Sequence, residues 1–250
     1  MQNTNTAHEA PLRSFRITVP EPAQSGVAAL LEEEGFRFEP EPFSACCRRL
    51  TAEPRPLGSS LAAFFGLIYI QDRSSMLPPL ALAPEKGAAV LDMCASPGSK
   101  TGFLAQLVGP GGFVLANEVS HSRLFTLRQN LRVCNFLQAG TCSYEGQNIP
   151  LATGSLRYIQ LDPPCSGWGT AVKNPKVMEL WHDDKVKPLI GLQRLLLRRA
   201  AELLAPGGVV VYSTCTTNSG ENERQVEYAE ACLGLTREPL DPFPGRHPAR

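Results

Sequence analysis

Two cysteines stand in short polar segments, each of which follows an apolar run with the composition of a buried strand. Cys165 lies in the segment Asp162-Pro163-Pro164-Cys165-Ser166-Gly167, and Cys215 lies in Ser213-Thr214-Cys215-Thr216. In a parallel sheet the carboxyl ends of the strands meet at one edge, so we expect both thiols at that edge. Structural cysteines are usually buried and inert, and this placement favours a chemical role instead.

A second candidate site follows another apolar run. The segment from Asp92 to Thr101 contains a Pro-Gly turn and leads into a helical stretch, which is where open α/β sheets bind nucleotides and related ligands. A phosphate-binding Walker A loop would need glycine at 94 and 99, where the chain has Cys94 and Ser99. The G-x-G-x-x-G pattern is also missing, so neither a P-loop nor a dinucleotide site is predicted.

The next apolar run ends in Ala116-Asn117-Glu118, and an acid at this position can accept both hydroxyls of a ribose. The combination predicts an adenosine-like ligand that is held without a phosphate-binding loop. Another interpretation stays open on the pattern alone: Pro97-Gly98 is only a tight turn, and Glu118 is a solvated acid beside a helix N-cap.

A thiolate beside an adenosine-type ligand indicates one kind of chemistry. Carbon 5 of a pyrimidine is a poor nucleophile until a thiolate adds to carbon 6. An acid such as Asp162, three residues before Cys165, can then stabilise the base protonated at N3. A base must finally remove the proton from carbon 5, which the second cysteine could do directly or through water. On these residues alone, Cys165 and Cys215 are equal candidates for the nucleophile.

From about Leu61 onward, apolar runs alternate with helical stretches. This rhythm predicts an α/β fold with a parallel sheet and helices on both faces. The expected strands are Ala88–Met93, Gly112–Asn117, Tyr158–Asp162 and Val209–Ser213, and the expected helices are Ser99–Leu107, Ser120–Cys134, Pro188–Leu204 and Glu221–Ala231.

Residues 1–60 are rich in proline and less regular. We expect a small N-terminal lobe there, with a helix at Ala23–Glu34 and strands at Ser14–Val19 and Phe36–Phe38, followed by a catalytic domain over 61–250.

The charge balance argues against a chain that is basic throughout. Its 24 lysines and arginines equal its 24 aspartates and glutamates, whereas nucleic-acid-binding domains are usually strongly basic. Any RNA site must therefore be local. Lys173 and the cluster of Arg194, Arg198 and Arg199 are candidate phosphate contacts, although the three arginines fit a solvated helix face equally well.

The cysteine pattern and the length of the apolar stretches indicate in which cellular compartment the chain works. None of the eight cysteines forms a C-x-x-C pair, so we expect a reduced chain with no metal site and no disulfide scaffold. Leu61–Ile70 is too short to span a bilayer, and Met1–Glu9 has no signal-peptide core. We expect a soluble cytoplasmic chain without membrane contact, monomeric by default.

Together these motifs resemble the Sun (Fmu, nucleolar-protein) family of RNA cytosine-C5 methyltransferases over about Leu57–Glu227. The resemblance implies a Rossmann-like fold that uses S-adenosyl-L-methionine, and an RNA substrate. Glu118 and Ser99 are most similar to the subgroup acting on small-subunit ribosomal RNA, with transfer RNA as the other candidate. The matching segments are Tyr69–Pro78 before the first strand, Cys94–Thr101, Ala116–Ser120 with Arg123, Asp162–Gly167, Tyr212–Thr216 and Glu221–Glu223.

Roles for individual residues follow from the resemblance. It implies that Cys215 is the nucleophile, that Cys165 assists product release and that Asp162 contacts the base. Lys173 and Asn174-Pro175 lie where the family faces RNA, and Glu145 replaces an aspartate that contacts the adenine amino group. The implied cofactor-binding residues are Cys94, Ala95, Ser96, Pro97, Gly98, Ser99, Lys100, Glu118, Arg123, Glu145 and Asp162.

The C-terminal part departs from the family pattern. The family fold continues through two more strands, whereas only 232–250 follow the expected last helix, so we expect the sheet to lack those strands. The alternative function is a catalytically impaired or truncated RNA-binding or assembly factor that retains cofactor binding. The short end and the neutral charge favour this alternative, and the presence of Asp162, Cys165 and Cys215 together favours the enzyme.

Overall fold

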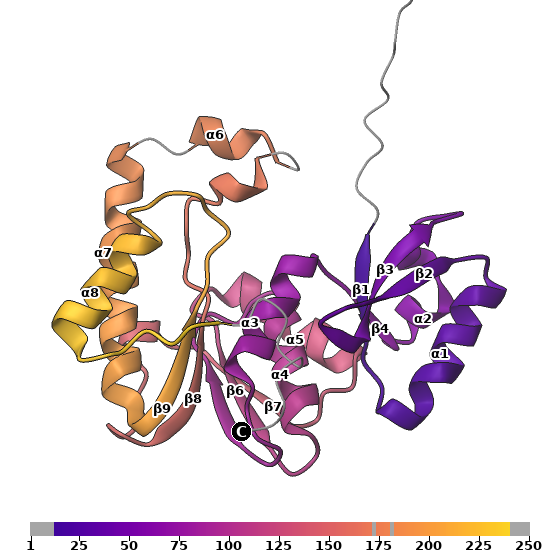
Figure 1. The fold of residues 1–250 in the computed structure, drawn as a ribbon, viewed down its shortest axis with the longest axis horizontal. Helices are drawn as coiled ribbons and strands as arrows, with labels where there is room; N and C mark the ends of the chain where they lie inside the picture. Colours follow the sequence, from indigo (N-terminus) through magenta and orange to yellow (C-terminus); the bar gives the residue numbers. More distant parts are fainter. Residues whose placement is uncertain (1–12, 172–173, 181–182, 241–250) are drawn as a thin grey trace, which may run out of the picture. The chain divides into compact units, whose positions relative to one another are not determined.

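A computed structural model describes residues 13–171, 174–180 and 183–240. The chain divides into two compact units between Arg73 and Ser74, and each unit contains its own β-sheet (Figure 1). Among the described residues, no helix is both long enough and apolar enough to cross a bilayer.

The N-terminal unit is a four-stranded sheet in the order β2-β3-β1-β4, with every pair antiparallel. Apolar side chains such as Phe15, Ile17 and Leu31 are fully buried and form its core. Its elements are β1 (Ser14–Ile17), α1 (Glu21–Glu33), β2 (Arg37–Glu41), β3 (Ser44–Ala52), α2 (Leu61–Phe64) and β4 (Ile68–Ile70).

This unit extends beyond residue 60, where we expected the catalytic domain to begin. Ile70 of β4 pairs with Phe15 of β1, which makes β4 an edge strand of the N-terminal sheet. Leu57, Ala62 and Ile68 are buried in the core of the same unit. The apolar stretch Leu61–Ile70 therefore contributes side chains to the core of the N-terminal unit.

The second unit has the Rossmann-like α/β architecture expected from the sequence. Its five-stranded sheet has the order β7-β6-β5-β8-β9, with every pair parallel. The elements are α3 (Leu77–Leu82), β5 (Ala89–Asp92), α4 (Ser99–Val108), β6 (Phe113–Asn117), α5 (His121–Val133), β7 (Ala139–Cys142), β8 (Leu156–Leu161), α6 (Lys176–Leu180), α7 (Asp183–Leu203), β9 (Leu204–Tyr212) and α8 (Glu223–Leu233).

Successive residues of β5 point to opposite faces of the sheet, and both faces are covered by helices. Val90 packs on one face in the cluster that contains Leu104 of α4 and Leu127 of α5. Leu91 packs on the other face with Leu196 of α7. Burial on both faces explains why this strand is a continuous apolar run rather than an alternating one.

Two elements of this unit start earlier than expected. Helix α7 begins at Asp183 and contains Pro188, which we placed at its start, and β9 already pairs with β8 at Leu204. No strand follows β9 within the described residues up to 240, so β9 forms an edge of the described sheet.

Candidate active site

The loop after β5 is fixed by a glycine that no other residue replaces without strain. Gly98 has φ +104° and directly precedes α4. A Cβ atom at this position would lie 2.9 Å from Cδ1 of Leu127. The backbone of the turn therefore approaches α5 closely, and α4 can begin at Ser99.

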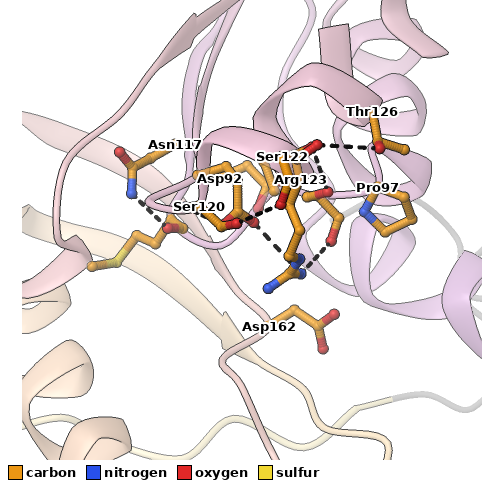
Figure 2. A network of polar contacts seen from close by, with 12 residues as sticks. Asp92, Pro97, Asn117, Ser120, Ser122, Arg123, Thr126 and Asp162 are labelled. Atoms are coloured by element: carbon orange, nitrogen blue, oxygen red, sulfur yellow. Dashed lines mark hydrogen bonds and ion pairs between the residues drawn. The ribbon is translucent and has the colours of Figure 1, made fainter. Parts of the chain in front are cut away.

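Hydrogen bonds hold this loop against β6 and α5. The Ala95 N–H donates to the Asn117 carbonyl over 2.9 Å. The Ser96 hydroxyl donates to the Arg123 carbonyl over 2.9 Å, and Nη2 of Arg123 donates back to the Ser96 carbonyl over 3.0 Å. Nδ2 of Asn130 donates to the Pro97 carbonyl over 2.7 Å. These hydrogen bonds fix the conformation of the loop from Asp92 to Thr101, which we call the cradle (Figure 2).

Glu118 directly follows β6, and its side chain is only 3% exposed. Its Oε1 accepts the Ser120 N–H over 2.9 Å, and its Oε2 lies 3.5 Å from Nη2 of Arg123. In Figure 2, dashed lines join the Arg123 guanidinium to the oxygen atoms that it contacts in this network. A carboxylate has about four acceptor positions, so Glu118 keeps capacity to accept further hydroxyl groups.

Glu145 is exposed on the loop after β7, where its carboxylate accepts Nδ2 of Asn148 over 2.8 Å. Asn117 ties this loop to the site, a role that the sequence did not reveal. Its Nδ2 donates to the Tyr144 carbonyl over 3.0 Å, and its Oδ1 accepts the Tyr144 N–H over 2.9 Å. The loops after β6 and β7 are therefore connected at the same sheet edge.

Lys100 links the cradle to the segment that carries the first cysteine. Its Nζ lies 2.6 Å from Oδ2 of Asp162, which follows β8. Oδ1 of Asp162 accepts the Ser213 hydroxyl over 3.1 Å. Asp162 is thus oriented by both neighbouring segments, while about a third of its side chain stays open to solvent.

Two other ionisable groups belong to the cradle, buried Asp92 and half-buried Cys94. Burial raises the pKa of Asp92 to about 6, although its Oδ2 accepts the Thr101 hydroxyl over 2.7 Å. Burial likewise raises the pKa of the Cys94 thiol. Because only a thiolate is strongly nucleophilic, Cys94 is suited to a wall of the cradle and not to covalent chemistry.

The two candidate catalytic cysteines lie next to each other beyond the carboxyl ends of β8 and β9. The sulfur atoms of Cys165 and Cys215 lie 3.2 Å apart, with Cys215 exposed and Cys165 half-buried. The hydrogen bond with Cys165 lowers the pKa of Cys215 to about 7. The same hydrogen bond, together with burial, raises the pKa of Cys165. The pair can hold a thiolate at Cys215 and a proton at Cys165, which separates two residues that were equivalent by sequence pattern.

The segments around the cysteines also touch through their backbones. The Gly169 N–H donates to the Cys215 carbonyl over 3.0 Å. A Cβ atom at residue 169 would lie 2.9 Å from that carbonyl oxygen, so only glycine allows this approach.

The basic residues that are candidate phosphate contacts differ in their surroundings. Lys173 lies outside the described residues, and the adjoining Asn174-Pro175 is exposed. Arg194 and Arg198 both contact Tyr228 of α8. Arg199 donates from Nη2 to the carbonyls of Ile149 and Leu151, each over 2.8 Å. All three arginines of α7 therefore have intramolecular contacts, and Arg199, whose side chain is mostly buried, supports the loop after β7 and is not part of a solvated helix face.

The chain is similar in sequence to known proteins. Residues 79–232 match the family described as 16S rRNA methyltransferase RsmB/F. The chain is 38% identical to a ribosomal RNA small subunit methyltransferase F from Serratia proteamaculans, over 98% of this chain and 53% of that protein. A protein of the same name from Shewanella amazonensis is also 38% identical, over 85% of this chain and 47% of that protein. The chain spans about half the length of these curated relatives.

Solved structures agree with the fold. A methyltransferase homologue from Pyrococcus horikoshii superposes with a TM-score of 0.78 at 35% identity, covering 90% of this chain and 71% of that one. A crystal structure titled PH0851 superposes with a TM-score of 0.84 at 27% identity, covering 94% of this chain and 54% of that one. By the match to the family description and by these relatives, the chain belongs to the 16S rRNA methyltransferase RsmB/F family.

Proposed function

We propose that this chain transfers a methyl group from S-adenosyl-L-methionine to carbon 5 of a cytosine in RNA, through a covalent adduct with Cys215. The 3.2 Å contact between Cys165 and Cys215 is the observation that carries the proposal, because it gives one sulfur a lowered pKa and the other a proton. The names of the curated relatives support ribosomal RNA as the substrate class, with transfer RNA as the other candidate.

The donor set of the cradle fits a nucleoside-containing sulfonium ligand. Glu118 would accept the two ribose hydroxyls, and Arg123 holds the carboxylate from the side. The segment Cys94–Lys100 would line the methionine part with backbone groups, and exposed Glu145 would reach the adenine amino group. When bound, S-adenosyl-L-methionine supplies an electrophilic methyl group at this edge of the sheet.

The protein's own groups divide the reaction between them. The Cys215 thiolate forms a bond to carbon 6 of the cytosine, which turns carbon 5 into a nucleophile. Asp162, held by Lys100 and Ser213, hydrogen-bonds N3 and stabilises the protonated ring. After methylation a water beside Cys165 accepts the proton on carbon 5, since Cys165 itself carries a proton. The electron pair of that C–H bond restores the double bond between carbons 5 and 6, the bond between carbon 6 and sulfur breaks to release the Cys215 thiolate, and the proton taken up from water at N3 returns to water.

The proposal is tested by incubating the purified chain with S-adenosyl-L-methionine and with small-subunit ribosomal RNA or transfer RNA. Mass spectrometry of the digested RNA should show 5-methylcytidine, and mapping total RNA from cells with and without the gene should place it. Cofactor binding without any 5-methylcytidine would instead support an RNA-binding or assembly factor. We further expect a monomer that acts in the cytoplasm.

A further inference from the structure

The buried carboxylate of Glu221 contacts Ser166, the residue after Cys165, and touches neither cysteine sulfur in any described contact. Glu221, between β9 and α8, is 0% exposed. Its Oε2 accepts the Ser166 N–H over 2.9 Å and Nε2 of Gln193 over 3.0 Å, while its Oε1 accepts the Ser166 hydroxyl over 2.5 Å. A buried carboxylate is costly unless such donors surround it, so this arrangement is specific to an acceptor group at 221.

The donors in this network have a fixed direction because a carboxylate only accepts. Since the Ser166 hydroxyl donates to Glu221, its oxygen must accept the Thr216 hydroxyl, which lies 2.7 Å away. The Thr216 oxygen in turn accepts the Asn218 N–H over 3.2 Å. The chain of donors therefore runs from the segment after β9 to Glu221 and passes through Ser166.

Two links of this chain each lie one residue from a reactive cysteine. Ser166 follows Cys165, and Thr216 follows Cys215. Gln193 of α7 also donates to the Pro164 carbonyl over 2.9 Å, so both neighbours of Cys165 are held by the same network. We infer that Glu221 is a positioning residue that joins the two cysteine segments and thereby sets the separation of the two sulfur atoms, an inference that rests on the proposed function.

The inference requires a carboxylate and not merely a side chain of that size. Both N–H donors, from Ser166 and Gln193, go to Oε2, so a glutamine at 221 could keep them with its carbonyl oxygen and would place its NH2 group against the Ser166 hydroxyl. The Ser166 hydroxyl would then accept that N–H and donate to Thr216, which reverses the chain of donors and leaves the Thr216 hydroxyl without its acceptor in the network, so the segment after β9 has to adjust. Displacements of about 1 Å in a catalytic arrangement can cost on the order of 10²-fold in rate.

The test compares Glu221→Gln with Glu227→Gln, which makes the same chemical change at an exposed position of α8. Alkylation of Cys215 by iodoacetamide is followed by peptide mass spectrometry across a pH series, beside kcat and KM for methylation and calorimetry with S-adenosyl-L-methionine. In Glu221→Gln we expect the pH midpoint of Cys215 alkylation to move up and kcat to fall by about 10- to 100-fold. KM and cofactor affinity should stay at the wild-type values, as should every property of Glu227→Gln.

Two outcomes would overturn the inference. One is a folded Glu221→Gln protein whose Cys215 alkylation profile matches the wild type. The other is a loss of cofactor affinity that accounts for the whole fall in turnover, because it would assign Glu221 a general structural role.

A second pair of variants decides the matter if Glu221→Gln does not fold. Thr216→Val removes the hydroxyl at nearly constant volume, and Thr216→Ser keeps it. The valine variant should shift the alkylation midpoint and the serine variant should restore it, whereas equal profiles for the two would contradict the inference. Alkylation needs neither RNA nor cofactor, so a wild type that forms no 5-methylcytidine would refute the proposed function while this comparison still decides the role of the network.

Discussion

The sulfur atoms of Cys165 and Cys215 lie 3.2 Å apart although 50 residues separate the two cysteines in the chain. Their strands explain this, because β8 and β9 are parallel neighbours with Leu161 beside Tyr212, and each cysteine follows shortly after its strand. The contact makes the two thiols unequal, since it lowers the pKa of Cys215 and raises that of Cys165.

The two cysteines should give opposite results in one gel assay. Cys215→Ala should abolish methylation and any covalent adduct with RNA, because no bond to carbon 6 can form. Cys165→Ala should still add to the base and methylate it but fail to release it, so an adduct should survive denaturing electrophoresis. If Cys215→Ala forms the adduct and Cys165→Ala does not, the roles are reversed.

The reactivity of Cys215 should follow its lowered pKa. The hydrogen bond with Cys165 lowers this pKa from 9.0 to about 7, so alkylation should rise with pH and reach half its plateau near pH 7. Cys165→Ala removes the bond, and the midpoint should move up toward the ordinary value. At neutral pH the Cys215 rate in that variant should fall by about tenfold or more. Peptide mass spectrometry measures both profiles, and coincident midpoints would exclude Cys165 as the cause.

The sequence predicted those elements whose burial leaves a simple pattern. β5, β6 and β8 are apolar runs between helices, and their positions agree with the structure within a few residues. β7 was missed because Ala139–Cys142 is a half-buried edge strand with no apolar run. β3 was missed because Arg48 and Arg49 interrupt its alternation between buried Cys47 and Leu50.

The sequence predicted that Asp162 and the two cysteines follow neighbouring parallel strands, but it did not predict the contacts between the side chains of the candidate site. Strand order places Asp162 near the cradle, yet its 2.6 Å contact with Lys100 depends on side-chain direction, which spacing alone does not give. The same holds for Asn117, whose amide joins two loops. The inequality of Cys165 and Cys215 arises from one hydrogen bond and from unequal burial, and neither has a signal in the local sequence.

Glu118 should contribute strongly to cofactor affinity. Its buried carboxylate retains free acceptor positions, and hydrogen bonds to a charged group contribute about 1.5–3 kcal/mol. Glu118→Ala should weaken S-adenosyl-L-methionine binding by that amount in calorimetric titration. Glu85→Ala, at an exposed acid of the same unit, is the control and should bind normally. An unchanged affinity for Glu118→Ala would mean that the ribose lies elsewhere.

Substitutions at Lys173 and Arg199 should distinguish a residue that contacts RNA from one that stabilises the fold. If Lys173 contacts a phosphate, Lys173→Ala should reduce the salt slope of RNA binding by about 1. Arg199→Ala should leave that slope unchanged and lower the free energy of unfolding by about 1.5–3 kcal/mol, because its guanidinium donates to two backbone carbonyls. Filter binding across a salt series and denaturant unfolding measure the two effects. An unchanged salt slope for Lys173→Ala would remove that residue from the RNA contacts.

Gly169 should be required for the pairing of the cysteines and not for cofactor binding. A Cβ at this position would lie 2.9 Å from the Cys215 carbonyl oxygen, so Gly169→Ala must push the two cysteine segments apart or lose the hydrogen bond between them. We expect slower alkylation of Cys215 at pH 7 and a kcat lowered by about tenfold or more. Calorimetry should give the wild-type affinity for S-adenosyl-L-methionine, because Gly169 has no described contact with the cradle. Gly191→Ala, in α7 with open space around the added methyl group, is the matched control. A Gly169→Ala protein with normal Cys215 alkylation would show that the pair tolerates displacement of its backbone.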